Sequence, residues 1–515
     1  MSSPLQNANL IRRIRRRLPS GASLFLPGIL LLAVALRCYG LARESLWLDE
    51  ATSLMLARMD VPTLIRWTSL DIHPPLYYTL LHFWIRLGES EAIVRGLSVM
   101  AGVFAVGVIY ALGEALFDKR TGLLAALLLA VAPMHVWYSQ EARMYAWVAL
   151  LMAASLLMAL RAWQTGRWPW WVGYVLITSA ALYTHYYAVF VVGVENLLVL
   201  YGLFRGWARG RLLRVWALAQ LGVFLLFLPW FPIFLLPITI GGGGWITMGV
   251  GRPSLSALAQ TAVLYMVGFG RELYPTWLRR LGYLLFGGLL VMGAWPQREP
   301  KPIAGRDGVT LRPVEALGMT LGYLALPLGL AWGVSQVFKP MYSARYMLPF
   351  LLPFLLLVAR GVARLPRALG QVAMAALVVL GLVGVQAQVT ALEKPDWRGL
   401  AQRLIERSEP GDVVLFMPGW HAKPFDYYAQ GALDLYSDVP IPVPRYGEKA
   451  LAAVDEALVG HRRVWFVWEN EHYTDPDGEV FKYLFQHCRL VENAPLERVG
   501  QVMLFAYCAP DEAGR

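Results

Sequence analysis

Long apolar runs alternate with short polar segments from the start of the chain to about residue 390. A helix that crosses a bilayer needs about 20 mostly apolar residues, with some allowance for tilt. Eleven runs meet this length, near residues 24–42, 92–117, 121–138, 142–163, 168–184, 187–204, 213–239, 278–295, 315–336, 346–364 and 368–390. The pattern predicts a polytopic α-helical membrane protein with about 11–13 spans.

Two further apolar segments are poor spans. Residues 74–87 are short and carry His82 and Arg86, and residues 254–270 form the second short run. We interpret both as interfacial or re-entrant helices, because counting either as a span would invert the side assigned to every later loop.

The chain changes character after residue 390, where no apolar run of spanning length remains. Short β-rich runs and stretches with helical apolar spacing follow instead. The strand-like runs are 412–417 and 463–468, and the helix-like stretches are 397–407 and 448–459. We therefore expect a membrane domain over residues 1–390, whose first outer loop (43–91) carries interfacial helices, and a small extracytoplasmic α/β domain over 391–515.

Composition and charge support a membrane protein and give its orientation. Hydrophobic residues make up 57% of the chain and charged residues only 16%, and the mean hydropathy is +0.47. The net charge of +11 comes from arginines grouped between apolar runs, which the positive-inside rule explains better than nucleic-acid binding. The basic start at residues 12–17 precedes a run without a cleavage site. This basic segment places the N-terminus on the inner side of the cytoplasmic membrane and the segment around Asp49 on the outer side.

Two of the three cysteines flank a predicted hairpin, residues 489–492 against 502–507. Cys488 and Cys508 either form a disulfide in an oxidising compartment or remain two buried thiols. Cys38 lies in the first span and is expected to pack there.

Ionisable and aromatic residues recur on the predicted outer side. They lie in five segments: Trp47 to Glu50, Asp71 to Tyr78, Ser139 to Tyr145, Thr184 to Tyr187, and Lys339 to Tyr346. Ionisable groups at the ends of successive spans are costly near lipid and usually line a site. This arrangement favours a membrane-embedded enzyme.

Each of these residues also has a structural interpretation. Asp49 and Glu50 could cap a helix that runs to Arg58, and Glu141 could do the same for the fourth span. His73 precedes two prolines that start a helix.

The remaining candidates have structural alternatives of other kinds. His185 and Tyr187 could belong to an interfacial aromatic belt, and Arg345 could extend toward lipid head groups. Glu195, inside the sixth span, is interpreted as a buried partner of an unidentified arginine.

The order of these motifs resembles the GT-C superfamily of glycosyltransferases. More narrowly, it is similar to the bacterial relatives of dolichyl-phosphate-mannose protein mannosyltransferases, family 39, and of the transferase that adds aminoarabinose to lipid A. The resemblance covers about residues 20–390. It is carried by Ser45-Leu46-Trp47-Leu48-Asp49-Glu50-Ala51, His73-Pro74-Pro75-Leu76-Tyr77-Tyr78, Ser139-Gln140-Glu141-Ala142-Arg143-Met144-Tyr145 and Arg345-Tyr346.

The resemblance implies a polyprenyl-phosphate-linked sugar as donor, an outward-facing active site and inversion at the anomeric carbon. It makes Asp49 the general base and Glu50 its acidic neighbour. An inverting transfer needs a carboxylate opposite the leaving group to take the acceptor proton.

The lipid phosphate that leaves needs charge stabilisation more than protonation. Its candidate cations are His73, Arg143, Lys339 and Arg345, and further substrate contacts are expected from Glu141, Tyr145, His185, Tyr187 and Tyr346. Some relatives have Lys where this chain has His73, so charge at this position becomes pH-dependent.

The sequence does not require a metal, although Asp49 and Glu141 are candidate ligands of a divalent cation. The identity of the sugar, the acceptor (a lipid, polysaccharide or protein hydroxyl) and the oligomeric state stay open. A multi-span transporter and a non-catalytic component of cell-envelope polysaccharide assembly are the alternative functions. An Asp49→Asn variant would separate them from the enzyme, because only the enzyme needs that carboxylate for transfer.

Overall fold

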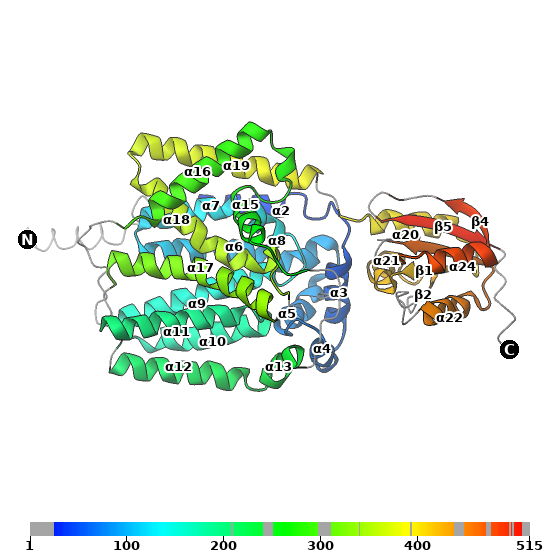
Figure 1. Cartoon of the computed structure of the whole chain (residues 1–515), viewed down its shortest axis with the longest axis horizontal. Helices are drawn as coiled ribbons and strands as arrows, with labels where there is room; N and C mark the ends of the chain where they lie inside the picture. The colour runs from blue at the N-terminus through cyan, green and yellow to red at the C-terminus, as the bar shows by residue number, and fades with distance from the viewer. Residues whose placement is uncertain are drawn as a thin grey trace, which may run out of the picture. The chain divides into compact units, whose positions relative to one another are not determined.

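The chain divides into two compact units in a computed structural model, shown in Figure 1. The first unit comprises Met1–Tyr39, Asp60–Trp84 and Arg95–Leu392, and the second comprises Gly40–Met59, Ile85–Val94 and Glu393–Arg515. The structure describes residues 25–206, 208, 210–239, 251–296, 311–338, 340–391, 394–436, 447–469, 475–493, 496 and 499–506. Lys339, Cys508 and the glycine run 241–244 lie outside these ranges.

The first unit is helical. Its α-helices are α2 (Phe25–Cys38), α4 (Val61–Thr68), α5 (Leu76–Trp84), α6 (Glu91–Leu116), α7 (Lys119–Ala130), α8 (Pro133–Ser139), α9 (Tyr145–Thr165), α10 (Trp168–Thr184), α11 (Ala188–Arg205), α12 (Arg211–Phe227), α13 (Phe231–Thr239), α15 (Ser256–Val267), α16 (Thr276–Ala294), α17 (Pro313–Val337), α18 (Leu351–Arg364) and α19 (Arg367–Ala391). The 3-10 helices η3 (Arg271–Leu273) and η4 (Ala344–Phe350) complete it. The first residues of α6 belong to the second unit.

Every predicted span coincides with one helix or with two consecutive helices. Within the described ranges, six helices are long and apolar enough to cross a bilayer: α6, α9, α11, α17, η4 with α18, and α19. The bent pair α7 and α8 makes a seventh candidate. The polytopic helical fold is confirmed and the chain is a multi-pass membrane protein. The larger count of 11–13 spans stays a prediction, because several of the remaining helices are only 14 to 17 residues long.

The predicted span over 121–138 is broken by a bend of 61° between α7 and α8. Pro133 is the first residue of α8. A proline has no backbone N–H to donate and keeps the preceding residue, here Ala132, out of the helical region. The first helix therefore ends at Ala130 and the chain turns before the second begins.

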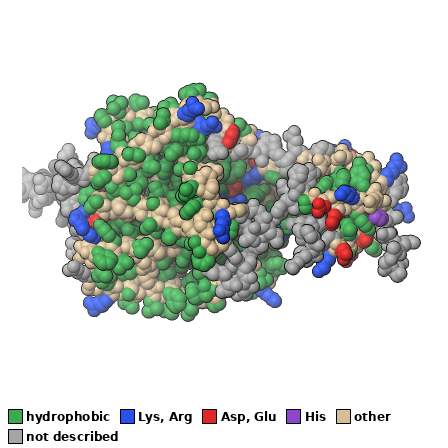
Figure 2. Space-filling model, in the orientation of Figure 1, with side chains coloured by type: hydrophobic (Ala, Val, Ile, Leu, Met, Phe, Trp, Pro, Cys, Tyr) green, Lys and Arg blue, Asp and Glu red, His purple; other side chains and the backbone are tan. Residues whose placement is uncertain are grey.

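Glycines allow the backbones of α16 and α18 to approach closely. A Cβ atom added to Gly293 would lie 1.9 Å from the Leu357 carbonyl oxygen, and one added to Gly361 would lie 2.1 Å from that of Leu289. Small residues serve this purpose in membrane helix pairs, where packing rather than the hydrophobic effect holds helices together. On the face that Figure 2 shows, hydrophobic side chains dominate the surface of the helical unit, as expected where lipid is the solvent.

Short helices lie within residues 43–91, the segment predicted to form the first outer loop. In the first unit, Asp60 caps α4 by accepting a hydrogen bond from the Thr63 N–H at 3.1 Å, and α5 begins directly after Pro74 and Pro75. In the second unit, α3 (Leu48–Arg58) and η2 (Ile85–Leu87) complete the set. The helix predicted to run from the acidic pair to Arg58 is confirmed.

The second unit contains a five-stranded sheet in the order β2-β1-β3-β5-β4. Its strands are β1 (Val413–Met417), β2 (Asp434–Tyr436), β3 (Arg463–Trp468), β4 (Arg489–Asn493) and β5 (Gln501–Ala506). β1 pairs in parallel with β2 and β3, whereas β5 runs antiparallel to both β3 and β4. The predicted α/β domain and its terminal hairpin are thus both present.

Helices cover both faces of this sheet, because alternate strand residues point to opposite sides. Val413 and Leu415 pack with α22 (Gly447–Leu458) and α24 (Glu479–His487). Val414 and Phe416 pack with α20 (Trp397–Arg407) and α21 (Ala422–Ala429) on the other face. A further 3-10 helix, η5 (Gly419–His421), precedes α21.

The cysteines differ in state. Cys488 is disulfide-bonded, which decides the open alternative for that residue, while Cys508, its expected partner, lies outside the described residues. Cys38 is a free thiol and is exposed on α2.

Candidate functional site

Histidine, arginine and tyrosine side chains from four segments of the first unit gather around Tyr346. The ring centroid of Tyr346 lies 4.7 Å from that of His185 and 5.1 Å from that of Tyr187. Tyr145 and His73 follow at 6.1 and 6.4 Å. These residues come from the loop before α5, the start of α9, the α10–α11 turn and η4, and together we call them the Tyr346 cluster.

His185 is buried and is fixed by its own turn. The Tyr187 backbone N–H donates to His185 Nδ1 at 3.1 Å, so the ring proton of the neutral form is on Nε2. Burial lowers the pKa of His185 well below its ordinary value, and the charges of His73 and Arg143 add to this. Within the described residues Nε2 has no hydrogen-bond partner. The ring therefore provides a neutral donor inside the cluster.

His73 is buried against an aspartate two residues earlier. His73 Nδ1 lies 3.9 Å from Asp71 Oδ2, and the His73 ring centroid is 5.6 Å from that of His185. Burial would raise the pKa of Asp71, but the hydrogen bond and charge of His73, assisted by the Ile72 N–H and Arg143, lower that pKa below its ordinary value. Asp71 is consequently ionised at neutral pH.

Arg143 is held by neighbouring helices. It is buried, its Nη1 donates to the Tyr78 hydroxyl at 3.3 Å, and its guanidinium carbon lies 5.9 Å from the centre of the Tyr145 ring. Ser98 of α6 donates to the Arg143 carbonyl oxygen at 3.1 Å, which fixes the backbone of the turn.

Arg345 lies beside Tyr145, with which its side chain forms a hydrogen bond, and near Tyr138. Tyr138 in turn stacks edge-on against Tyr145 at 5.2 Å. Two guanidinium groups thus adjoin the same tyrosine, and planar guanidinium forks suit phosphate oxygens.

The remaining predicted residues of the first unit are also placed. Glu141 and Tyr145 are buried at the α8–α9 turn. Tyr187 is buried, and its hydroxyl donates to the Met341 carbonyl oxygen. The belt interpretation of His185 and Tyr187 is therefore wrong, because each is only 5% exposed.

The acidic pair opens α3 in the second unit. Glu50 is fully buried, and its Oε2 accepts from the Trp47 backbone N–H at 3.3 Å and from Lys394 Nζ at 3.1 Å. Asp49 is the second residue of the helix and is partly exposed. The capping role is thus observed for Glu50, whose ion pair with Lys394 fixes the start of the helix.

Sequence reasoning gave no role to several residues beside these groups. Asp71 and Tyr78 stand in the same motif as His73, so their position was a usable signal. Tyr138 precedes the Glu141 motif by one helical turn. Lys394 follows Glu50 by 344 positions, and no local pattern could have paired them.

Glu195 differs from its interpretation. Its carboxylate accepts from the Ser155 and Tyr174 hydroxyls, both at 2.9 Å. The expected arginine partner is not among the residues that the structure describes around it. In the described part of the chain as a whole, no group of three or more His, Cys, Asp or Glu side chains forms a candidate metal site.

Comparison with known proteins relates this chain to one family. Residues 72–233 match the model of the dolichyl-phosphate-mannose-protein mannosyltransferase family. No curated protein sequence matches the chain.

Solved structures show the same fold. The crystal structure of ArnT from Cupriavidus metallidurans in the apo state has a TM-score of 0.64 and 12% identity, covering 96% of this chain and 100% of that one. The same protein bound to undecaprenyl phosphate has a TM-score of 0.62 and 14% identity, covering 95% of this chain and 99% of that one. The oligosaccharyltransferase of Archaeoglobus fulgidus, in complex with Zn and sulfate, has a TM-score of 0.56 and 14% identity, covering 94% of this chain and 73% of that one. Residues 72–233 of this chain are thus similar to the dolichyl-phosphate-mannose-protein mannosyltransferase family, and the chain shares its fold with these solved structures.

Proposed function

We propose that this protein transfers a sugar from a polyprenyl-phosphate-linked donor to an acceptor hydroxyl on the outer side of the cytoplasmic membrane, with inversion. The observation that carries the proposal is the Tyr346 cluster, with its two adjoining arginines. Two similar structures support the lipid donor by what their proteins bind: ArnT with undecaprenyl phosphate, and the archaeal enzyme AglB with a dolichol-phosphate.

The cluster and its arginines are suited to the leaving phosphate. As the bond from the anomeric carbon to the phosphate oxygen breaks, the electron pair stays on the phosphate, and its negative charge grows. Arg143 and Arg345 are placed beside Tyr145 to stabilise that charge, and His185 Nε2–H adds a neutral donor. The lipid phosphate thus leaves as an anion without a general acid.

Asp49 is the proposed general base. The acceptor oxygen forms the new bond to the anomeric carbon, and its proton passes to the Asp49 carboxylate. Glu50 is less suited to this role because its Oε2 already binds Lys394 Nζ and the Trp47 N–H. We assign Glu50 to positioning the start of α3, and through it Asp49.

The acceptor stays a hydroxyl of a lipid, polysaccharide or protein. Glu141 and Tyr187 remain proposed substrate contacts, as does Lys339, which lies outside the described residues. No metal is assigned, although Asp49 and Glu141 stay candidate ligands of a divalent cation.

The test replaces Asp49 with Asn. We expect sugar transfer to fall by about 10²- to 10⁴-fold, the usual contribution of a general base, while the protein stays folded and retains its donor. Mass spectrometry of lipids that co-purify with the variant would then show an enriched polyprenyl-phosphate sugar and would identify the sugar.

The matched control is Asp60→Asn, an equal change eleven positions later, at the exposed cap of α4. It should leave transfer nearly unchanged. Unimpaired transfer by the Asp49→Asn protein would refute the base assignment, and absence of a polyprenyl-phosphate sugar from a folded Asp49→Asn protein supplied with cell membranes would refute the donor class.

A further inference from the structure

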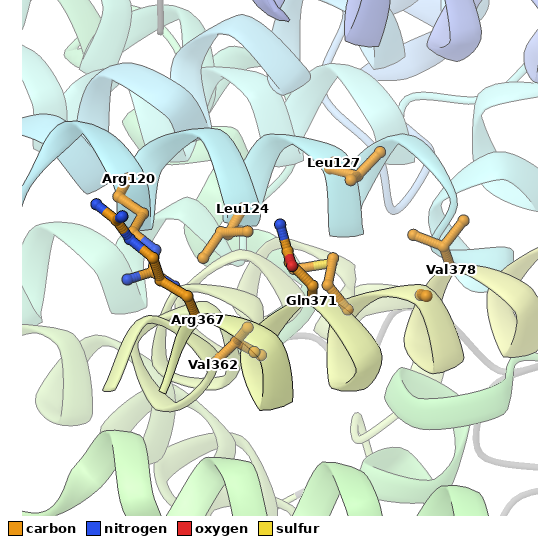
Figure 3. Close-up of a pocket in the computed structure, with 10 residues that line it drawn as sticks. Arg120, Leu124, Leu127, Val362, Arg367, Gln371 and Val378 are labelled. Atoms are coloured by element: carbon orange, nitrogen blue, oxygen red, sulfur yellow. The ribbon is translucent and has the colours of Figure 1, made fainter. Parts of the chain in front are cut away.

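A groove opens on the first unit between α7 and α19, with Val362 of α18 at its base. It encloses about 570 Å³. Figure 3 shows Arg120 and Arg367 together at one end, with Leu124 and Val362 next to them. Gln371 follows, and Leu127 and Val378 lie toward the other end. We call this the α7–α19 groove. It combines a cationic end with an apolar channel.

Among the residues that the structure describes, Arg120 and Arg367 have no anionic partner, and neither guanidinium forms an ion pair or a hydrogen bond. Asp118, the nearest acid along the chain, is occupied: its carboxylate accepts from the Thr121 N–H and hydroxyl, both at 2.9 Å. Two guanidinium groups at one end of a groove repel each other unless an anion lies between them. Phosphate is the anion that such forks bind best.

The Arg120 guanidinium lies beside the start of α19. A Cβ atom added to Gly370 would lie 3.4 Å from Arg120 Nη2, an ordinary contact distance, and 3.1 Å from the Val362 carbonyl oxygen. Arg120 of α7 therefore reaches the first turn of the helix that carries Arg367.

The apolar part matches a lipid chain. Arg120, Leu124 and Leu127 lie on one face of α7, and Gln371, Met374 and Val378 lie along α19. At 1.5 Å per residue the walls extend about 10 Å on α7 and about 16 Å on α19. This is close to the depth of one leaflet, half of a hydrocarbon core of about 30 Å.

A second groove flanks the other side of α7. It encloses about 760 Å³ between α7 and α2, and it shares Arg120, Leu124 and Leu127 with the first. One phosphate at Arg120 can thus have an apolar channel on either side of α7. That arrangement fits a lipid with two chains better than a single-chained polyprenyl phosphate.

The groove is separate from the Tyr346 cluster. Arg345 and Tyr346 precede α18, whereas Arg367 follows it, and the 14 residues of α18 alone measure about 21 Å. We propose that the α7–α19 groove binds an anionic phospholipid of the surrounding bilayer, with its phosphate between Arg120 and Arg367 and its chains along α7. On the predicted orientation this is the cytoplasmic leaflet.

The experiment reconstitutes the full chain into nanodiscs of equal parts phosphatidylglycerol and phosphatidylcholine, and measures retained lipid by native mass spectrometry. We expect the wild type to retain phosphatidylglycerol in about tenfold excess. Arg120→Gln with Arg367→Gln should reduce this to the ratio of the nanodisc. The control pair Arg211→Gln with Arg214→Gln removes equal charge from exposed sites of α12 and should retain the excess.

A second pair of variants keeps all four arginines. Ala375→Trp fills the groove and should abolish the excess, whereas Val379→Trp, on the exposed side of α19, should not. This pair decides the matter if the arginine variants do not fold.

The proposal would be overturned if the Arg120→Gln/Arg367→Gln variant retained the same excess of phosphatidylglycerol as the wild type. It would also be overturned if both double arginine variants lost the excess equally. Equal effects of the two tryptophans would overturn it as well. An added undecaprenyl phosphate that displaces phosphatidylglycerol from the wild type would show that the groove belongs to the polyprenyl lipid instead.

Discussion

The buried carboxylate of Glu50 stabilises the start of α3. The sequence offered it as part of a catalytic acidic pair, but its carboxylate caps α3 and binds Lys394, with side chains 0% and 12% exposed. A buried ion pair is costly to break, because removal of one partner leaves the other charge unpaired. The neighbouring Asp49, the proposed general base, is partly exposed on the same helix turn.

We predict that Glu50→Ala destabilises the second unit by about 3 kcal/mol or more, since it removes both a helix cap and a buried ion pair. Unfolding of the detergent-solubilised protein would measure this. Glu50→Gln combined with Lys394→Met should be less damaging than the sum of the single changes, because no charge is then left unpaired.

Glu89 provides the control for that prediction. It pairs with Arg58 at 2.6 Å, but the two side chains are 39% and 44% exposed. An exposed pair contributes little, so Glu89→Gln should have a much smaller effect. Equal effects of Glu50→Gln and Glu89→Gln would contradict the structural role of Glu50.

A second prediction at this scale concerns the pH dependence of Asp71. Burial would raise the pKa of Asp71, but His73 holds that pKa below its ordinary value. A carboxylate with a depressed pKa contributes stability that is present at neutral pH and is lost as the pH falls through the folded-state pKa. His73→Gln removes the partner and leaves burial to dominate.

We therefore expect His73→Gln to lower the melting temperature at pH 7, and the difference from the wild type to shrink below pH 4. Melting curves from pH 7 to pH 3 test this. His82→Gln, on the neighbouring α5 and outside the cluster, should follow the wild type. A difference that stays constant over the whole range would exclude the Asp71–His73 interaction as its cause.

At the scale of elements, α2 and the bend between α7 and α8 satisfy each other's free carbonyl groups. Arg37, fully buried in α2, donates to the Leu129 and Ala130 carbonyl oxygens, both at 3.1 Å. Gln140 Nε2 returns hydrogen bonds to the Arg37 and Tyr39 carbonyl oxygens at 3.1 and 2.8 Å. Helix ends leave such carbonyls without partners, so the bend that precedes Glu141 and Arg143 depends on this exchange.

Arg37→Met should consequently lower the free energy of unfolding by roughly 2–6 kcal/mol, because two buried carbonyl groups lose their donors at about 1–3 kcal/mol each. Arg37→Lys should recover little, since an ammonium lacks the planar fork that reaches both oxygens. Arg66→Met, an exposed arginine of α4, is the control and should not change the melting temperature. A stable Arg37→Met protein would show that the bend is held by Pro133 alone.

Contacts between neighbouring helices also account for the surroundings of Glu195. Ser155 of α9 and Tyr174 of α10 donate to its carboxylate in α11, and Gln220 of α12 donates to the Tyr174 hydroxyl at 2.8 Å. Hydroxyl groups from neighbouring helices thus replace the arginine that charge alone suggested. Figure 1 shows α9 to α12 side by side, which is what brings these groups together.

At the scale of the whole molecule, the two units differ in what stabilises them. The first relies on helix packing in lipid, whereas the second has a two-sided hydrophobic core and a disulfide at Cys488. A disulfide stabilises a domain mainly by restricting its unfolded chain.

Cys488→Ser is expected to destabilise the second unit by about 2–4 kcal/mol while leaving the first unit's unfolding unchanged. Calorimetry of the solubilised protein, with and without a reductant, would measure both. Cys38→Ser, a change at the free and exposed thiol, should have no effect on either unit. A single transition that shifts as a whole would show instead that the units unfold together.

Local patterns along the chain were enough to predict the regular elements of this protein. Runs of spanning length predicted the helices of the first unit, short β-rich runs predicted strands such as β1 and β3, and local motifs indicated His73, Glu141 and Arg345. These elements depend on interactions between near neighbours along the chain, and hydrophobic periodicity indicates them directly.

The contacts between distant side chains became evident only in the folded molecule. The tertiary structure placed Tyr346 between His185, Tyr187 and Tyr145, gave Lys394 to Glu50 and Arg37 to the bend after Ala130, and replaced the expected partner of Glu195. Such pairs depend on how each helix is rotated and on which helices become neighbours. A hydrophobic pattern leaves both undetermined when a helix is apolar on nearly every face, as membrane helices are.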